Sequence, residues 1–489
     1  MDARHGRRPV RPMDVLRAVE RYVTREHRQI GASLTRISLG VWAVYFYLLH
    51  WPVRHALWGP DGFFPHEAFL ELGPSLNVFA VSRSPLYADA VMVAGLLLAV
   101  AVALGAAPRV VLPLHWLLVW SLQERNPLLT DGGDNIMRIA LLFLCLTNTA
   151  AYGAVGTGML MPGRAAWGRR VRLHHFGPSV GTCRRLLATV RLGGAAWRAC
   201  LAAVGRAAAA WGTRWAATGR AVRAVLHNAG VTLIVAQLCL VYLSTGFYKT
   251  MGELWQQGTA LYYILRVDEF SLPGRAEVVY RSTPLVVLGT YGTVVFELMF
   301  LPCLANRWTR YAVIATGVVF HAAIAYLMGL VTFAWSMLSL YPLLVTDDEY
   351  RGLAAWIRRR WGLRVFYDGW CPACTRSARW LARLDLAGLV RWISFRDPEV
   401  VERYGLDPDR AARRIQSLDS RRRRREGIDA LLAVAVRTPA LWPLVPVLGL
   451  GRRVAGQRLY DALAARRVIV VPGACATHCP ATPPRGAKG

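Results

Sequence analysis

The chain has 489 residues but contains few charges, few cysteines and almost no lysine. Charged residues make up 18% of the sequence and apolar residues 54%, which excludes an ordinary soluble protein and indicates a membrane protein. Only two of the 59 basic residues are lysines. The nine cysteines are spread singly through apolar runs, apart from the pairs Cys371/Cys374 and Cys475/Cys479, and this spacing excludes a disulfide scaffold.

Long apolar runs predict a multi-span α-helical membrane bundle over residues 31–347. The first run contains Arg36 and has no small-residue cleavage site, so we interpret it as an uncleaved anchor that follows a basic arm at 1–30. Two runs are short for a bilayer, which needs about 20 residues, so eight is a working count. The predicted spans are residues 33–51, 87–106, 109–121, 134–152, 229–248, 283–304, 308–328 and 331–346.

The distribution of arginine predicts the orientation of these spans. Residues 153–228 contain twelve arginines and no acidic residue, whereas residues 249–282 contain both signs. Because basic loops stay in the cytoplasm, we expect a multi-pass protein of the cell membrane with this loop and both termini cytoplasmic. The loop either forms a basic amphipathic helix on anionic membrane lipid or is a poorly ordered insertion. The net charge of +29 lies beside apolar spans, so no nucleic-acid partner is expected.

Three stretches of the membrane part carry motifs, namely "QERNPLLTDGGDNIMR" (123–138), "QLCLVYLSTGFYKTMGELWQQGTALYYIL" (237–265) and "VVFHAAIAYLMG" (318–329). They resemble the HTTM family, the bacterial membrane relatives of vitamin K-dependent gamma-carboxylase. The resemblance implies that Lys249 is the base that deprotonates a vitamin K-like hydroquinone, with Trp255 and Gly258 as supporting residues of the motif. A quinone or another lipid-soluble molecule would then be the cofactor or substrate of this domain.

Lysine at position 249 is also chemically suited to be a base. A desolvated lysine can lose its proton near neutral pH, whereas an arginine cannot. The alternative is that Lys249 only extends its ammonium to the outer interface at a helix end. Among the other ionisable residues of the spans, His321 is expected about 10 Å below the outer surface and Glu297 about 10 Å above the inner one. We therefore predict His321 as the neighbour of Lys249.

Two acidic residues flank a pair of glycines in the first motif stretch. Asp131 and Asp134 would either hold a metal or form a capping turn at the start of a helix, and we favour the cap and predict no metal. Asp134 and Arg138 are four residues apart with the acid first, which predicts an ion pair along the helix.

The stretch "VFYDGWCPACTRSARWL", from residue 365, places two cysteines between an apolar run and a helix-like pattern. With "GIDALLAVAV" and "LWPLVPVLGLGRRVAGQRLYDALAARR" it resembles the DCC family, also called DUF393, of predicted thiol-disulfide oxidoreductases. The resemblance implies a small α/β thioredoxin-like domain over residues 362–470. A strand at 363–367, a helix from Cys374 and a second strand at 389–395 agree with this fold.

A Cys-x-x-Cys at a helix N-terminus favours a thiolate, because free N–H groups and the helix dipole stabilise negative charge. By the resemblance, Cys371 attacks a disulfide and Cys374 resolves the mixed disulfide, and a cytoplasmic thiol protein is the partner. Asp368 and Gly369 complete the motif. Asp368 would either accept a proton or cap the turn, and we favour the cap.

Zinc is the alternative use of the cysteine pair, with Cys475, His478 and Cys479 as further donors. These residues lie in a Pro- and Gly-rich tail at 471–489 that we expect to be disordered, so thiol exchange is favoured. The arginine run at 420–426 is interpreted as a solvated or lipid-facing loop.

Together these features predict a membrane protein with oxidoreductase character, in which a cytoplasmic thiol-disulfide exchange domain is tethered to a gamma-carboxylase-like membrane domain. The thiol domain stands where the carboxylase has a long non-cytoplasmic domain for its peptide substrate, so gamma-carboxylase-like activity is left open but is not favoured. The alternative is a non-catalytic transport or scaffold protein with a redox-sensing or zinc-binding tail.

Overall fold

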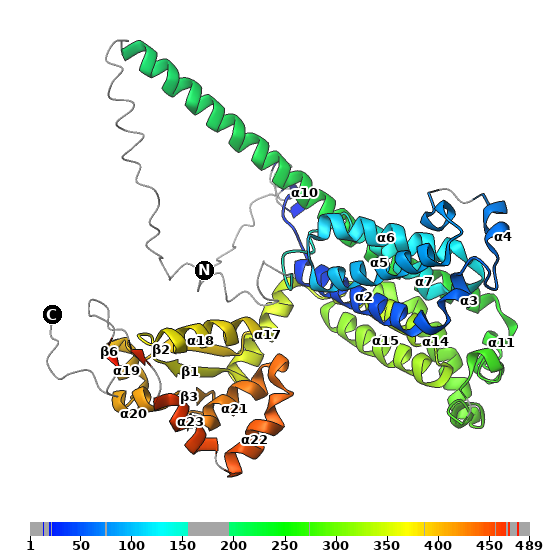
Figure 1. Cartoon of the computed structure of the whole chain (residues 1–489). Coiled ribbons are helices and arrows are strands. Elements are labelled where there is room, and N and C mark those ends of the chain that lie inside the picture. Colours follow the sequence, from blue (N-terminus) through cyan, green and yellow to red (C-terminus); the bar gives the residue numbers. More distant parts are fainter. Residues whose placement is uncertain are drawn as a thin grey trace, which may run out of the picture. The chain divides into compact units, whose positions relative to one another are not determined.

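The computed structural model describes residues 22–73, 76–154, 195–272, 274–385, 387–454 and 456–465, with short pieces at 13, 19–20, 468–469 and 477–478 (Figure 1). Contacts within the chain define two compact units among these residues. The first is mostly helical and ends at Asp347, and the second is a smaller α/β unit that begins at Asp348.

The first unit consists of helices joined by short turns. Its described helices are α2 (Gln29–His50), α3 (Arg54–Trp58), α4 (His66–Glu71), α5 (Pro85–Leu104), α6 (Pro108–Arg125), α7 (Gly132–Leu144), α10 (Ala195–Met251), α11 (Glu253–Gln256), α12 (Ala260–Ile264), α13 (Glu277–Tyr280), α14 (Thr283–Cys303), α15 (Arg307–Met328) and α16 (Val331–Leu338). Among the described residues, five helical segments are long and apolar enough to cross a membrane. They are Gln29–Trp58, Pro85–Leu104, Ala217–Met251, Thr283–Cys303 and Arg307–Met328.

The three other predicted spans are also helical, but they are shorter or more polar. The run predicted at 109–121 is α6, which ends in Gln-Glu-Arg, and the run predicted at 134–152 is α7, with 13 residues. The last run is α16, with eight residues, followed by a 3₁₀ turn at Tyr341–Leu344. A bilayer needs about 20 residues of helix. The count of eight spans therefore stays a prediction, and five of the eight have the length and apolar composition of a spanning helix.

Helix α10 changes the interpretation of the basic loop at 153–228. Residues 195–228 are helical and continue without interruption into the predicted span, so that α10 has 57 residues. Its many alanines and arginines are strong helix formers. Residues 155–194 lie outside the described part of the chain, and a position of the basic segment on the lipid surface stays a prediction.

Glycines allow close helix packing in this unit. A Cβ atom at Gly40 of α2 would lie 2.5 Å from the backbone nitrogen of Ala103 in α5, and one at Gly230 of α10 would lie 2.6 Å from the carbonyl oxygen of Phe143 in α7. Small residues let helix backbones approach where lipid provides no hydrophobic driving force. The buried core fills the space between α2, α5, α7 and α10.

Arg36 is fully buried inside α2. Its guanidinium donates to the carbonyl oxygens of Ala103 and Gly153, each at 2.8 Å, and to further carbonyls at the end of α5 and in the segment after α7. Gly105, with φ of 68°, ends α5 beside it, and a Cβ atom there would lie 2.9 Å from the guanidinium carbon. The charge thus joins three segments by hydrogen bonds to backbone groups that have lost access to water.

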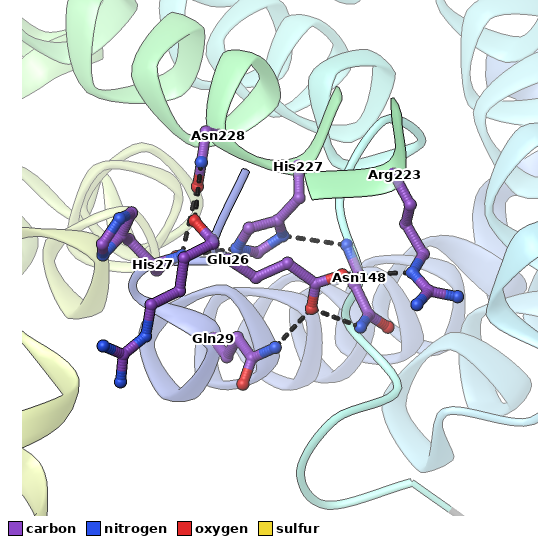
Figure 2. Close-up of polar contacts among 8 residues, drawn as sticks. Glu26, His27, Gln29, Asn148, Arg223, His227 and Asn228 are labelled. Carbon is purple, nitrogen blue, oxygen red and sulfur yellow. Dashed lines mark hydrogen bonds and ion pairs between the residues drawn. The ribbon is translucent and has the colours of Figure 1, made fainter. Parts of the chain in front are cut away.

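A polar cluster attaches the segment before α2 to α10 and to the turn after α7 (Figure 2). Glu26 accepts hydrogen bonds from Asn148 Nδ2 at 2.7 Å and from Arg223 Nε at 3.2 Å. His227 Nδ1 accepts from the backbone N–H of Asn148 at 2.9 Å, so its Nε2 carries the proton and donates to the carbonyl of His27 at 2.6 Å. Burial opposes ionisation of Glu26, but these donors and charges hold its pKa below the usual value.

The second unit is a four-stranded sheet covered by helices. Strand β1 (Leu363–Tyr367) pairs in parallel with β2 (Val390–Ser394) and antiparallel with β3 (Gln416–Asp419), and β4 (Arg424–Glu426) completes the order β2-β1-β3-β4. A parallel β-α-β unit followed by a hairpin and a helix is the arrangement expected of a thioredoxin-like domain. The helices are α17 (Asp347–Trp361), α18 (Pro372–Leu384), α19 (Pro398–Tyr404), α20 (Pro408–Arg413), α21 (Ile428–Arg437), α22 (Leu444–Val454) and α23 (Gly456–Ala465).

The two faces of this sheet have separate cores because successive residues of a strand point to opposite faces. Val365 of β1 belongs to a cluster with Ala378 of α18 and Val434 of α21. The next residue, Phe366, belongs to a second cluster with Leu406 and with Ala411 of α20. Helices α18 and α21 therefore cover one face, and α19 and α20 cover the other.

Both predicted strands agree with β1 and β2 to within one residue at each end. The helix predicted from Cys374 begins two residues earlier, at Pro372, with Cys371 as its N-cap. Proline suits the first turn of a helix because its φ is already close to the helical value and its missing N–H would have no partner there.

The interpretation of residues 420–426 as a solvated loop is correct for 420–423, which form an exposed turn, and wrong for Arg424–Glu426. Residues Arg424–Glu426 pair with β3 as strand β4, and Arg422, with φ of 60°, lies in the turn between the two strands. The run of charges alone does not predict a strand, but β3 precedes it in a hairpin and supplies the backbone hydrogen bonds that a strand needs. Of the tail at 471–489, for which disorder is predicted, the structure describes only Thr477–His478, the strand β6, which pairs antiparallel with β5 (Val468–Ile469). The zinc donors Cys475 and Cys479 and the side chain of His478 lie outside the described residues.

Replacing Arg36 by methionine is expected to destabilise the protein by about 3 kcal/mol, because several buried carbonyls would lose a charged donor. Methionine keeps an unbranched apolar stem, so the change isolates the hydrogen bonds. Thermal unfolding of the purified protein in detergent, followed by tryptophan fluorescence, measures the effect. The matched control is Arg109→Met at the exposed start of α6, which should unfold like the wild type. An Arg36→Met protein as stable as this control would contradict the prediction.

Candidate functional site

The cysteine pair of the second unit lies where β1 passes into α18. Cys371 is the N-cap of α18, and its Sγ accepts a hydrogen bond from the backbone N–H of Cys374 at 3.3 Å. The side chain of Cys371 is buried and that of Cys374 is partly exposed, and no disulfide joins the two. The first sulfur therefore faces the positive end of the helix dipole, which favours a thiolate.

Asp368 orders the turn before the cysteines. Its Oδ1 accepts from the backbone N–H of Trp370 at 3.0 Å, which is the turn cap predicted from the sequence. Its two oxygens also accept from Arg396, Oδ1 from Nε at 2.8 Å and Oδ2 from Nη2 at 2.7 Å. The side chains of Asp368 and Arg396 are only 2% and 11% exposed, so this is a buried bidentate ion pair. Both oxygens are engaged, so Asp368 holds the turn and is not placed to take a proton.

Gly369 lets this turn lie against the end of β2. A Cβ atom at position 369 would overlap with Oγ of Ser394, the last residue of β2. The same hydroxyl accepts a hydrogen bond from the backbone N–H of Arg396 at 3.3 Å. Any side chain at Gly369 would push the cysteine turn away from β2, so the glycine of the motif serves close packing.

Arg396 is the residue of this site that the sequence interpretation missed. Strands β1 and β2 are parallel, so their carboxyl ends lie at the same edge of the sheet. Asp368 follows β1 and Arg396 follows β2 at that edge, where α/β sheets usually place their functional residues. The sequence signal that could have predicted this ion pair was therefore an acidic residue after one strand and a basic residue after the next. The guanidinium carbon also lies 4.4 Å from the ring centroid of Trp370.

A second candidate site lies in the helical unit, where Lys249 near the end of α10 meets Glu297 of α14. Lys249 Nζ donates to both carboxylate oxygens, each at 2.9 Å. The lysine side chain is 21% exposed and the glutamate side chain 6%. Trp255 lies beside the ammonium, with its ring centroid 5.2 Å from Nζ, a cation–π contact. Ionisable residues inside an apolar helix bundle are typical of functional sites.

The prediction that His321 is the neighbour of Lys249 is wrong, because Glu297 takes that place. The prediction assumed that α10 ends level with the start of α14. The chain continues along α14 beyond the end of α10, and the hydroxyl of Tyr291 in α14 donates to the carbonyl of Gln256 in this continuation at 2.8 Å. The end of α10 therefore lies opposite the middle of α14. A Cβ atom at Gly246 of α10 would lie 3.2 Å from Cβ of Glu297, so the two helices are in close contact here.

His321 of α15 belongs to a buried network that reaches α10 and the 3₁₀ turn at Tyr341–Leu344. Its Nε2 lies 2.7 Å from the hydroxyl of Tyr242, which lies 2.7 Å from the hydroxyl of Tyr341. Gly317 leaves room for this network, because a Cβ atom there would overlap with the Tyr341 hydroxyl. Tyr242 lies two turns before Lys249 on α10, so the network and the ion pair follow one another along this helix.

Gly258, the last supporting residue of the lysine motif, has φ of 73° and lies in the turn before α12. Glycine adopts this left-handed conformation without strain. A Cβ atom there would also lie 2.9 Å from the ring of Tyr291. The glycine thus lets the segment after α10 turn back against α14.

Asp131 and Asp134 form the predicted cap at the start of α7. Asp131 Oδ1 accepts from the backbone N–H of Asp134 at 2.8 Å, and Asp134 Oδ2 accepts from that of Asp131 at 3.2 Å. Within the described part of the chain, no group of three or more His, Cys, Asp or Glu residues could hold a metal ion. The charge of Arg138 acts favourably on Asp134, as the spacing predicts, but the direct ion pair of Arg138 is with Glu124 of α6, at 2.8 Å.

Two family models match separate parts of the chain. Residues 207–348 match the HTTM domain, and residues 365–470 match the DCC1-like thiol-disulfide oxidoreductase domain. The HTTM match contains the second and third motif stretches with the Lys249 pair, and the stretch at 123–138 lies before it. The DCC1-like match contains the cysteine turn.

One curated relative is the uncharacterized protein YitO of Bacillus subtilis (strain 168), which is 27% identical over 135 residues. The aligned part is 26% of this chain, and the chain spans 42% of the length of YitO. No solved structure matches the chain. The chain therefore carries an HTTM domain followed by a DCC1-like thiol-disulfide oxidoreductase domain, in the order that its motifs indicate.

Proposed function

We propose that this membrane protein exchanges thiols and disulfides through Cys371 and Cys374. The observation that carries the proposal is the position of Cys371 Sγ at the N-cap of α18, within a domain that matches a thiol-disulfide oxidoreductase family. A helix N-terminus favours the thiolate, and the thiolate is the form of cysteine that attacks disulfides.

The exchange has two steps. The Cys371 thiolate attacks one sulfur of a partner disulfide, and the other partner sulfur leaves as a thiolate that takes up a proton. The Cys374 thiolate then attacks Cys371 Sγ, which releases the second partner thiol and leaves an intramolecular disulfide. Two electrons and two protons pass from the domain to its partner, and the reverse sequence reduces the domain.

Access to Cys371 requires opening of the turn at 368–371, because its side chain is buried. Asp368 and Arg396 hold this turn closed through their ion pair, and Cys374 is the partly exposed member of the cysteine pair. A partner that competes for Arg396 would loosen the turn. The partner is a cytoplasmic thiol protein or peptide, since reducing thiols are maintained in that compartment.

We infer the cytoplasmic position from the distribution of charge. The segment from the last apolar helix into β1 reads "WIRRRWGLR", and twelve arginines without an acidic residue occur in 153–228. Basic residues next to spanning helices remain on the cytoplasmic side.

The membrane domain would handle a lipid-soluble substrate with an acidic hydroxyl group, such as a quinol. Support comes from the ion pair of the partly buried Lys249 with the buried Glu297. In an apolar site, transfer of the proton from the ammonium to the carboxylate leaves two neutral groups, which avoids the cost of desolvated charge. The free amine of Lys249 would then accept the proton of the substrate.

A structural role is the second candidate for this pair, and the two 2.9 Å hydrogen bonds of the lysine favour it. In that case the membrane domain is a scaffold or transporter, and the ion pair only joins α10 to α14.

The cysteine roles predict opposite results for two variants. Cys374→Ser should accumulate a mixed disulfide on Cys371, because the resolving thiol is missing, whereas Cys371→Ser should form no adduct. Mass spectrometry of the purified protein after incubation with glutathione disulfide measures the adduct. Cys239→Ser, in α10, is the control and should cycle like the wild type. Trapping in Cys371→Ser alone would assign the attack to Cys374, and trapping in neither variant would remove the exchange function.

The orientation predicts which sites an impermeant maleimide reaches in intact cells. In a cysteine-free background, a cysteine at Ser420, exposed beside β3, should react only after the membrane is permeabilised. A cysteine at Glu269, exposed between α12 and α13, should react without permeabilisation. The reverse pattern would place the thiol domain outside the cytoplasm.

The base hypothesis predicts that Lys249→Arg abolishes turnover without loss of stability. Arginine can still pair with Glu297 through two hydrogen bonds, but it cannot give up its proton. We expect a loss of about 100-fold or more in oxygen uptake with a short-chain naphthohydroquinone. His321→Ala, which does not touch the lysine, should lose less. Full activity in Lys249→Arg, or no activity of the wild type with a panel of quinols, would favour the structural role.

A further inference from the structure

A stripe of arginines runs along the outer face of α18, the helix that begins at the cysteine pair. It consists of Arg376, Arg379 and Arg383, and all three residues are exposed. Their spacing of three and four residues places them on one face of the helix, over a length of about 10 Å. Ala378 and Leu381, on the opposite side, pack into the core of the unit. The stripe therefore faces the solvent.

The stripe starts close to the reactive cysteines. Pro372, the residue after Cys371, is exposed and lies one turn before Arg376 on the same face of α18. Trp380 lies beside the stripe with 55% of its surface exposed, and it offers an apolar contact next to the charges. A molecule that reacts at Cys371 therefore meets this face of the helix.

The arginines of the stripe have no acidic partner in the described part of the chain. By contrast, Arg396, Arg414 and Arg425 of the same unit each pair with an aspartate. Helix α18 contains no acidic residue, although the helix dipole favours acidic residues in a first turn and α19, α20 and α21 each have one there. The stability of the helix therefore does not explain the stripe.

Carboxylates are the groups that such a surface binds. The guanidinium of arginine donates two parallel N–H groups to a carboxylate, and clusters of exposed arginines recognise acidic peptide segments. The length of the stripe, about 10 Å, is greater than one carboxylate spans, so it fits an extended segment with several acidic residues.

We propose that the disulfide substrate of this domain is a peptide or protein segment with acidic residues beside its cysteine, and that Arg376, Arg379 and Arg383 bind those residues. The inference rests on the proposed thiol exchange and names its partner. The arginines attract and orient the segment, while Cys371 and Cys374 pass two electrons and two protons to its disulfide.

An acidic partner also suits the closed form of the cysteine turn. Asp368 holds this turn through its ion pair with Arg396, and access to Cys371 requires that the turn opens. Carboxylates of the bound segment are the groups that compete with Asp368 for Arg396. The partner that the stripe selects is therefore chemically suited to open the turn.

Oxidation of the reduced full-length protein in uncharged detergent tests the partner class. The probes are symmetric disulfides of one short peptide with blocked termini, whose cysteine is flanked by aspartates, asparagines or lysines. Mass spectrometry after alkylation measures oxidation of the Cys371/Cys374 pair. Each rate is divided by the rate at which the same probe oxidises dithiothreitol, a neutral dithiol, which removes differences in the intrinsic reactivity of the disulfides.

At an ionic strength of about 10 mM, the normalised rate with the aspartate probe should exceed that with the asparagine probe about threefold or more. The lysine probe should be slower than both. The preference should disappear at about 1 M ionic strength, where charges more than about 3 Å apart are screened. These measurements on the wild type do not depend on the folding of any variant.

Two matched double variants assign the preference to the stripe. Arg376→Gln/Arg379→Gln should lose most of it, and the rate with the asparagine probe should stay within about twofold, because glutamine is a good helix former and both sites are exposed. Arg421→Gln/Arg423→Gln removes the same charge from the exposed turn between β3 and β4. That turn lies at the opposite edge of the sheet, since β3 is antiparallel to β1, so this control should keep the preference.

Equal normalised rates of the wild type with the aspartate and asparagine probes would overturn the inference and leave the exchange function standing. A full preference in Arg376→Gln/Arg379→Gln would overturn it as well. A higher normalised rate with glutathione disulfide than with the aspartate probe would assign the stripe to a small substrate, against the proposal. Oxidation by none of the probes would remove the exchange function and this inference with it.

Discussion

A charge buried among apolar helices is stable only where neighbouring groups replace the water that it has lost, and this requirement shapes the helical unit. Arg36 is surrounded by backbone carbonyls of the end of α5 and of the segment after α7, and Lys249 is held by the carboxylate of Glu297. The partners come from segments far apart in the chain. Each buried charge therefore also specifies which segments must pack together, and at what level along their axes.

The α/β unit uses the same kind of interaction at the edge of its sheet. Asp368 and Arg396 join the carboxyl ends of two parallel strands, and this pair holds the turn that delivers Cys371 to the start of α18. Because Cys371 Sγ occupies the N-cap position, the dipole of α18 favours its thiolate form. The ion pair of Asp368 and Arg396 holds the sulfur at that position. The reactive group thus depends on two effects that different parts of the chain supply.

Glycine has a consistent role at these sites. At Gly246 the missing side chain lets α10 approach α14 beside the lysine pair, and at Gly317 it makes room for the hydroxyl of Tyr341. At Gly369 it lets the cysteine turn lie against β2. At Gly317 and Gly369 a hydroxyl group occupies the space that a Cβ atom would need, and at Gly246 side chains of α14 occupy it. The polar networks therefore need these positions as much as they need their own donors and acceptors.

The sequence by itself determined the features that depend on neighbours within a few residues. The apolar runs, the strands at 363–367 and 390–394, the Cys-x-x-Cys turn with its Asp368 cap and the capping box of Asp131 and Asp134 all follow from local periodicity and spacing. The two domain resemblances rest on such local motifs. Tertiary structure decided the partners of the charges. Lys249 and Glu297 are 48 residues apart, and Asp368 and Arg396 are 28 apart. The first pairing depends on where along their axes α10 and α14 meet, and the second depends on the parallel order of β1 and β2. Spacing along the chain encodes neither arrangement, because the length and direction of the intervening turns are set only when the chain folds.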